Sequence, residues 1–338
     1  MTERLDRFMA RANAAYYATH DPYRDFTTSP EISQVFGEIL GLWSAAAWEQ
    51  IGRPDPVLLV EAGPGRGTLM ADALRAAARV APEFRAALRL HLIEGSPRLR
   101  ALQAGQLPEA TWHAGLDSVP EQPLLLLANE FLDALPIRQF VRRSELWTER
   151  FVTEGRWQEY PVAEPPPLPN PLPQMEVGSS GHDPPQPTII ERNQPAIAIA
   201  ATLGTRLSAH PGAALFLDYG PEHSAPGDSL QALRGGRPVD PLTAPGTADL
   251  TAHVDFAAIA ASARSAGAAV HGPIPQGVFL TRLGLFQRTD RLARTQSPAR
   301  GSALIESARR LAEPHRMGRL FKALALTSPG SPTPPGFE

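Results

Sequence analysis

Three glycines at alternate positions follow a short apolar run near residue 60, and this segment most clearly suggests chemistry. Residues 58–69 read LLVEAGPGRGTL, so Gly63, Gly65 and Gly67 stand between a predicted strand and a predicted helix. Glycines let the backbone turn sharply and let a ligand approach the main chain closely. The amides and the dipole at the start of the helix then favour an anion. We therefore predict a small-molecule site at this loop.

Two ligand classes use such a loop, and the spacing of the glycines bears on both. A dinucleotide needs G-x-G-x-x-G, whereas the third glycine comes one residue early here, and Pro64 removes an amide that a pyrophosphate would use. Glu61 ends the strand directly before the loop, and E-x-G-x-G-x-G resembles the pattern of methyltransferases that bind S-adenosylmethionine. On this segment alone, S-adenosylmethionine, a dinucleotide and a tight turn without a ligand all remain open.

Two further acids follow later predicted strands. The segment HLIEGSP ends a strand at Glu94, where a carboxylate can accept both ribose hydroxyls of an adenosine. Asp117, in WHAGLDSVP, is predicted to lie beside the adenine. A surface or capping role is the alternative for Glu94. With Glu61 and the three loop glycines, Glu94 and Asp117 complete the predicted cofactor-binding set.

A third group of polar residues follows the apolar run at 124–128. The segment LLLLANEFLDALP breaks into Asn129, Glu130 and Asp133, and ligands of doubly wound sheets lie at the carboxyl ends of the strands. Methyl transfer is an in-line displacement that depends on positioning and on handling the acceptor's charge or proton. One or two carboxylates would hold a guanidinium acceptor. We predict these three residues as catalytic; the alternative is that Asn129 and Asp133 cap the following turn.

Other segments carry weaker signals. In RDFTTSPEISQVFGE, Ser29 and Pro30 are typical of a helix start, with a lid over the ligand as the functional alternative. His253 and Asp255 stand two apart in TAHVDF, but a catalytic pair there is not favoured. No two histidines have the helical spacing of metal ligands, so no metal site is expected.

The composition excludes several classes of protein. The 338-residue chain has no cysteine, which excludes disulfide scaffolds, thiolate zinc sites, cysteine nucleophiles and the iron–sulfur clusters of radical chemistry. A net charge of -3 gives no basic footprint for nucleic acid, and no apolar run approaches a membrane span. Lys322 is the single lysine beside 31 arginines, which we interpret as nucleotide bias rather than function. The N-terminus has no secretory signal, so a cytosolic enzyme is expected.

Strands and helices that alternate along the chain must position these residues. Such alternation predicts a mostly parallel sheet covered on both faces. Strands are expected at 57–61, 90–94, 124–128, 213–219, 268–271 and 320–326, and helices at 68–80, 189–210 and 255–266.

An insertion interrupts this pattern. Strand-like runs at 138–143 and 146–160, the second with a turn at Glu154-Gly155, indicate a small antiparallel flap. Ten of the 36 prolines lie in 161–187, which is read as a surface excursion. The predicted organisation is a helical N-terminal cap at 1–56 and one large domain at 57–338, with an inserted α+β subdomain at about 136–187.

Seven motifs in order carry a resemblance to a known family: FTTSPEISQVFGEILG, VEAGPGRGTLM, HLIEGSPRLRALQ, NEFLDALPIRQF, LFLDYG, DLTAHVDF and HRMGRLFKAL. Together they resemble the MidA-like family of class I S-adenosylmethionine-dependent methyltransferases, which includes a mitochondrial protein arginine methyltransferase needed for assembly of respiratory complex I. The resemblance implies an α/β fold with a seven-stranded sheet and a smaller insertion. It also implies cofactor contacts at Gly63, Gly65, Gly67 and Glu94.

The function predicted from residues and resemblance together is protein arginine N-methylation with S-adenosylmethionine as cofactor. The expected partner is a protein substrate, either a subunit of NADH:quinone oxidoreductase (complex I) or another protein, with no nucleic acid and no membrane insertion. The expected location is the bacterial cytoplasm, or the mitochondrial matrix for a eukaryotic chain. The alternatives are a non-catalytic assembly factor that binds the cofactor and, less favoured, a nicotinamide-dependent dehydrogenase.

Overall fold

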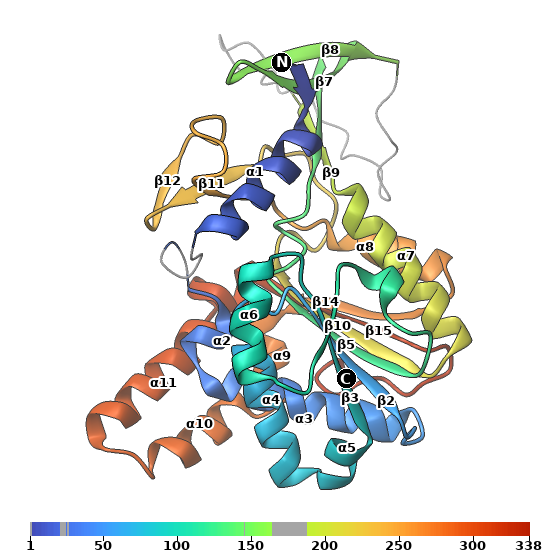
Figure 1. The fold of residues 1–338 in the computed structure, drawn as a ribbon, viewed down its shortest axis with the longest axis vertical. Coiled ribbons are helices and arrows are strands. Elements are labelled where there is room, and N and C mark those ends of the chain that lie inside the picture. The colour runs from blue at the N-terminus through green and yellow to red at the C-terminus, as the bar shows by residue number, and fades with distance from the viewer. Residues whose placement is uncertain (1, 21–24, 26, 145, 164–187) are drawn as a thin grey trace, which may run out of the picture.

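The computed structural model describes residues 2–20, 25, 27–144, 146–163 and 188–338. Within them the chain forms a large lower part and a smaller upper part, as drawn in Figure 1. The lower part is built on a seven-stranded sheet with helices on both faces, and the upper part contains a five-stranded and a three-stranded sheet. None of the helices in the described ranges combines the length and the apolar character that crossing a membrane requires.

The seven-stranded sheet confirms the predicted fold class. Its strand order is β4-β3-β2-β5-β10-β15-β14, and only β15 runs antiparallel to its two neighbours. The carboxyl ends of the other strands therefore meet at one edge of the sheet. In chain order the strands are β2 (Val57–Ala62), β3 (Leu88–Ile93), β4 (Thr111–His113), β5 (Leu124–Asn129), β10 (Gly212–Tyr219), β14 (Ala269–Pro275) and β15 (Phe321–Thr327).

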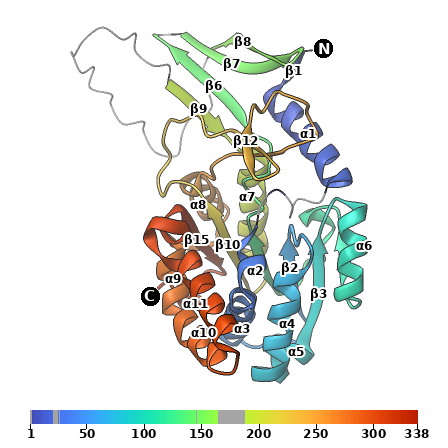
Figure 2. The ribbon, with the colours of Figure 1, turned by 90° about the vertical axis from the view of Figure 1, so that its left-hand side faces the viewer.

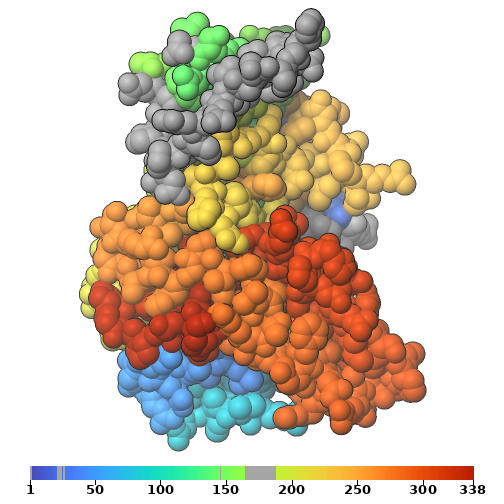
Figure 3. Space-filling model, turned by 180° about the vertical axis from the view of Figure 1, so that it is seen from behind, coloured from blue at the N-terminus to red at the C-terminus, as the bar shows by residue number. Residues whose placement is uncertain are grey.

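Alternation of side chains along the central strands fills two cores, one on each face. In β5, Leu125 and Leu127 join one core while Leu124 and Leu126 join the other, as the two-residue period of a strand requires. The first core is covered by α3 (Gln34–Gln50), α4 (Thr68–Val80), α9 (Gln276–Arg282), α10 (Leu285–Ala293) and α11 (Pro298–Ala312). The second is covered by α7 (Gln194–Ala209) and α8 (Phe256–Ser265). Seen from behind, the orange and red C-terminal elements cover much of the lower part (Figure 3).

The helix after the glycine loop packs closely against α3. A Cβ atom at Gly41 would lie 2.6 Å from the Cα atom of Ala73, and one at Gly37 would lie 2.7 Å from the Cβ atom of Asp72. Only glycine permits this approach, so Gly37 and Gly41 fix α4, and with it the loop that precedes α4, against the first core.

The upper part is formed by segments that are distant in the sequence. Its larger sheet contains β1 (Thr2–Arg4), β6 (Arg138–Arg143), β7 (Leu146–Thr153), β8 (Arg156–Val162) and β9 (Thr188–Arg192), and its smaller sheet contains β11 (Gln231–Arg234), β12 (Arg237–Val239) and β13 (Asp249–Thr251). Helix α1 (Leu5–Thr19) packs Phe8 and Met9 with Val152 and Leu250 into a third core. The predicted turn between β7 and β8 is confirmed, because Glu154 and Gly155 have φ of 51° and 70°, as a two-residue hairpin loop requires.

One predicted element is wrong at its start. Residues 189–192 do not begin a helix but belong to β9, where Ile190 pairs with Phe140 of β6. The helix α7 starts only after Asn193, whose side chain accepts a hydrogen bond from the amide of Ala196 at 3.0 Å. β-Branched residues favour a strand when a partner strand is available, and the distant β6 supplies it.

The predicted division into cap, domain and insertion remains a prediction. Helix α1 packs with the upper sheets, whereas α3 covers the seven-stranded sheet, so the first 56 residues contribute to both parts. Most of the predicted proline-rich excursion, at 164–187, lies outside the described residues.

Candidate functional site

A cavity of about 630 Å³ lies at the carboxyl ends of β2, β3 and β5. Figure 2 shows β2 and β3 pointing up toward α1, which lies above them, while α6 (Pro97–Gln106) lies below α1 beside β3. The cavity is lined from below by the segments that follow the three strands and from above by Asn13 and Tyr17 of α1. The strand order therefore places the predicted segments around one space, although they are far apart in the sequence.

The glycine loop forms one wall of this cavity. Gly63, Gly65 and Gly67 have φ of 68°, 55° and 85°, a region that favours glycine, and a Cβ atom at Gly63 would lie 2.7 Å from the ring of Phe131. Gly63 and Gly65 line the cavity, whereas Gly67 does not. The amide of Gly67 instead donates to the carbonyl of Pro64 at 2.7 Å and closes the turn from which α4 begins.

Glu94 lines the cavity directly after β3, and its carboxylate is held at both oxygens. The amide of Ser96 donates to Oε1 at 2.7 Å, and Nε2 of Gln103 donates to Oε2 at 3.2 Å. Burial raises the pKa of Glu94, and these two hydrogen bonds partly offset the effect. The carboxylate is thus oriented while each oxygen keeps a lone pair for a ligand.

Gln103 is a positioning residue that sequence reasoning missed. Its side chain is fully buried and also donates to the carbonyl of Gly65 at 2.7 Å, while its oxygen accepts from Nε1 of Trp112 at 2.8 Å. It therefore ties the glycine loop, Glu94 and β4 together. Because Gln103 lies in a helix of weak amphipathic pattern, no periodic signal indicated which face would carry it.

Glu61, the one acidic residue of β2, lines the cavity and has 3% of its surface exposed. Burial, with a smaller contribution from the nearby charge of Glu94, raises its pKa to about 8. Its Oε2 atom is buried and has no hydrogen-bond partner among the described residues. A buried carboxylate oxygen without a partner is costly unless a ligand donates to it.

The far end of the cavity is apolar apart from Asp117. Ile93, Leu99 and Leu116 line it, and Asp117 stands exposed in a 3₁₀ turn at Leu116–Ser118. This combination suits the flat ring of a base, with a carboxylate at its edge.

Asn129 and Glu130 line the cavity on the side of β5. The amide of Ser29 donates to Oε1 of Glu130 at 2.8 Å, and Nδ2 of Asn129 donates to the same oxygen at 3.1 Å. Glu130 has a φ of 49°, so its side chain leaves the strand direction at the point where β5 ends. Burial raises its pKa, and the two hydrogen bonds lower it. The Oδ1 atom of Asn129 is buried and without a partner in the described chain.

Asp133, the third predicted catalytic residue, is not among the residues that line the cavity. It lies in a buried group of acids in which burial, followed by the charges of Asp218 and Asp249, raises its pKa strongly. Oδ2 of Asp218 accepts hydrogen bonds from the amides of residues 131, 132 and 133 at 2.9–3.3 Å. Asp218 therefore holds the loop that carries Glu130, a role that sequence reasoning did not assign.

The segment proposed as a lid contributes to the roof of the cavity. Thr28, Pro30 and Glu31 line it, and Oγ1 of Thr68 donates to Oε1 of Glu31 at 2.6 Å. Residues 21–24 and 26 of the same segment lie outside the described residues.

Helix α1 completes the roof through polar contacts with both parts. Asn13 donates to the carbonyls of Ala134 and Leu250 at 3.0 and 2.8 Å, and the hydroxyl of Tyr17 donates to Asp249 at 2.7 Å. The sequence signal for Asn13 is a polar residue on the otherwise apolar, buried face of an amphipathic helix.

Comparisons with known proteins agree with this geometry. Residues 39–274 match the model of a family described as "Putative S-adenosyl-L-methionine-dependent methyltransferase". The mitochondrial protein arginine methyltransferase NDUFAF7 homolog of Drosophila melanogaster is 32% identical over 96% of this chain and 80% of its own length. Human mitochondrial protein arginine methyltransferase NDUFAF7 is 31% identical, over 96% of this chain and 79% of its own length.

A solved structure resembles the whole chain. It is a COG1565 superfamily member from Burkholderia thailandensis, bound to S-adenosyl-homocysteine. It aligns with a TM-score of 0.77 and 25% identity, covering 100% of this chain and 89% of its own.

Proposed function

We propose that this chain, which belongs to the family of S-adenosylmethionine-dependent methyltransferases and has their class I fold, methylates arginine side chains of a protein. S-Adenosylmethionine is the cofactor, and the family membership argues against the dehydrogenase alternative. The observation that carries the arginine proposal is the half-buried side chain of Glu130. Its carboxylate is held at the cavity wall beside Oδ1 of Asn129, which has no partner among the described residues.

The described residues fit the cofactor. Glu94 would accept from the ribose hydroxyls, because both of its oxygens are already oriented by donors from the protein. Glu61, whose Oε2 atom lacks a partner among the described residues, would accept from the ammonium group. The amide of Gly65 would face the carboxylate, because the amide of Gly63 already donates to the carbonyl of Ile93 at 3.0 Å. Asp117 would lie beside the adenine. The bound cofactor supplies an electrophilic methyl group on a sulfonium.

The other polar wall of the cavity suits a guanidinium group. Its planar N–H fork would donate to Glu130 and to Oδ1 of Asn129, which orients the guanidinium for attack. Methylation of a guanidinium releases one proton, and the Glu130 carboxylate is positioned to accept it, since burial already raises its pKa. Asp133 has no direct role in this proposal and acts with Asp218 in the buried group behind the loop.

The names of the curated relatives support a protein acceptor. The relatives in fly and human are named as mitochondrial protein arginine methyltransferases. We extend this class of acceptor to the present chain, with a subunit of NADH:quinone oxidoreductase as the leading candidate. The proposed location is the bacterial cytoplasm or, in a eukaryotic cell, the mitochondrial matrix.

The test is methyl transfer from isotope-labelled S-adenosylmethionine to separate subunits of the oxidoreductase, with methylarginine identified by mass spectrometry. The wild-type chain and the control Glu121→Gln, which changes an exposed acid outside the cavity, are expected to give labelled arginine. Glu130→Gln is expected to give at least about 100-fold less, as for loss of a general base. Label on another residue type would refute the arginine proposal, and cofactor binding without any product would favour the non-catalytic assembly factor.

A further inference from the structure

A second cavity, of about 480 Å³, lies where the upper part meets the segments that follow β10 and precede β15. The charged side chains that line it are Lys322, Arg316, Arg319, Glu191 and Asp255, and His253 lies among them. Five of these six residues come from the motifs DLTAHVDF and HRMGRLFKAL, and none of the five has a role in the methyl-transfer site.

Lys322, the only lysine of the chain, is buried in this cavity with 6% of its surface exposed. Its Nζ atom donates to the carbonyls of Arg319 and Leu320 at 2.5 and 3.3 Å. Among the described residues no carboxylate lies within 4.0 Å of Nζ, although the charge of exposed Glu222 acts on it from further away. An ammonium group has three N–H donors, so one remains for a further acceptor. A buried cation without a carboxylate partner is costly unless a ligand compensates it.

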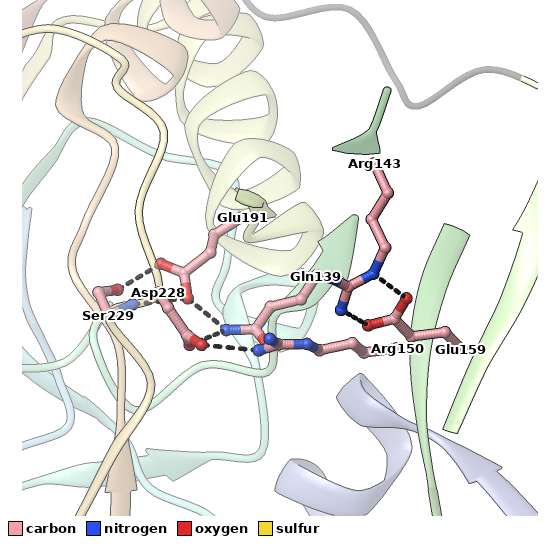
Figure 4. A network of polar contacts seen from close by, with 7 residues as sticks. All are labelled: Gln139, Arg143, Arg150, Glu159, Glu191, Asp228 and Ser229. Atoms are coloured by element: carbon pink, nitrogen blue, oxygen red, sulfur yellow. Dashed lines mark hydrogen bonds and ion pairs between the residues drawn. The ribbon is translucent and has the colours of Figure 1, made fainter. Parts of the chain in front are cut away.

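The acids that line the cavity are already bound to other groups. Figure 4 shows Glu191 accepting from Nε2 of Gln139, at 2.7 Å, and from Ser229. The same network continues through Asp228 to Arg150, at 2.7 Å. Both oxygens of Asp255 accept from the hydroxyl of Ser224 at 2.8 Å.

Neutral donors hold both acids, and neither acid makes an ion pair with a described residue. Arg316 pairs with Glu306 and Glu313, but Arg319, at the exposed mouth, makes no ion pair with a described residue. The cavity therefore presents one buried and one exposed cation whose charge the described side chains do not neutralise.

We propose that this second cavity binds an oxyanion, a carboxylate or a phosphate, between the ammonium of Lys322 and the guanidinium of Arg319. Such an oxyanion would accept a hydrogen bond from the remaining N–H of Lys322 inside the cavity. At the mouth of the cavity it would accept a bidentate pair of hydrogen bonds from Arg319. The amide of His253, which donates to Ser229 at 2.8 Å, and the Glu191 network keep the opposite wall fixed.

The position of the cavity relates the bound anion to the acceptor. Residues 134–136 line the first cavity and Ile137 lines the second, so one short segment separates the two. An acidic side chain or a phosphate group on the acceptor protein could occupy the second cavity while another residue of that protein reaches Glu130. Binding of the anion itself does not depend on the identity of the methylated residue.

The single lysine makes a direct test possible. The untagged chain, grown with 13Cε-lysine, gives one side-chain resonance, which we would follow at constant ionic strength in the presence of S-adenosyl-homocysteine. Three probes are titrated separately: inorganic phosphate, acetate, and a capped peptide that contains one glutamate, alongside its glutamine counterpart. We expect a saturable shift of the Lys322 resonance with at least one of the oxyanions.

Two variants control for the site, and both keep the labelled lysine. Arg319→Gln is expected to weaken anion binding about tenfold or more, the cost of one charge-assisted hydrogen bond. Arg300→Gln, which changes an exposed arginine of α11 outside the cavity, is expected to leave binding unchanged.

The three probes separate the sources of the anion. A shift with the glutamate peptide but not with its glutamine counterpart supports an acidic side chain, and a shift with phosphate alone supports a phosphate group. The absence of a saturable shift with every probe, or equal weakening in both arginine variants, would overturn the site. None of these readouts requires turnover, so a failed methylation assay would leave this result interpretable.

Discussion

Replacing Glu94 by glutamine tests the proposed ribose contact while preserving the shape of the side chain. In Glu94→Gln, Oε1 can still accept the amide of Ser96, which donates at 2.7 Å in the wild type. The new amide nitrogen then faces Nε2 of Gln103, so two donors oppose each other where a hydrogen bond of 3.2 Å was present. Gln103 cannot turn over freely, because its oxygen accepts from Trp112.

The expected loss in cofactor binding follows from these contacts. One hydrogen bond from a ribose hydroxyl to a charged oxygen disappears, at about 1.5–3 kcal/mol, and the opposed donors add to the cost. We expect a total of about 2–4 kcal/mol, which corresponds to ~30- to 1000-fold weaker binding of S-adenosyl-homocysteine. The fold loses the hydrogen bond from Gln103 as well, but burial already disfavours the charged form of Glu94, which limits the cost in stability.

Isothermal titration calorimetry with S-adenosyl-homocysteine measures this loss. The matched control is Glu121→Gln, the same substitution at an exposed site outside the cavity, and its dissociation constant should equal that of the wild type. A folded Glu94→Gln protein that binds within about twofold of the wild type would refute the ribose assignment.

Three further predictions concern the same cavity. Gly63→Ala should abolish measurable cofactor binding, because a Cβ atom has no room there and a φ of 68° strains any residue other than glycine. The control Gly105→Ala, on the open side of α6, should bind the cofactor normally in the same titration. Glu130→Gln should lower kcat about 100-fold or more with little change in cofactor affinity; loss of affinity without loss of kcat would remove Glu130 from the acceptor side. Burial raises the pKa of Glu61 from 4.5 to about 8 in the folded protein. Between pH 4.5 and pH 8 the folded protein therefore binds more protons at this residue than the unfolded chain does. The free energy of unfolding should therefore fall as pH rises from 4.5 to 8, and Glu61→Gln should flatten that slope in urea titrations; an unchanged slope contradicts the assignment.

The parts of the site that depend on local sequence could be predicted. The glycine loop and α4, which begins at Thr68 and ends at Val80, follow from local pattern and from the tolerance of glycine for positive φ. Glu61, Glu94 and Glu130 were placed at one cavity because the carboxyl ends of parallel strands share an edge of the sheet.

The parts that depend on distant pairing could not be predicted. Asp133 was assigned to catalysis, but its environment is set by Asp218, 85 residues away on the neighbouring strand. Ile190 was assigned to a helix, but pairing with Phe140 makes it part of a strand. In both places a partner far along the chain decides the outcome, and no local pattern contains that information.

A crystal structure of this chain with S-adenosyl-homocysteine tests the central claim most directly, namely that the cavity at the carboxyl ends of β2, β3 and β5 is the methyl-transfer site. The account predicts ribose hydroxyls bound to Glu94, the amino group beside Glu61, and the sulfur atom facing Asn129 and Glu130. A ligand that binds elsewhere, or one whose sulfur points away from Glu130, would contradict it.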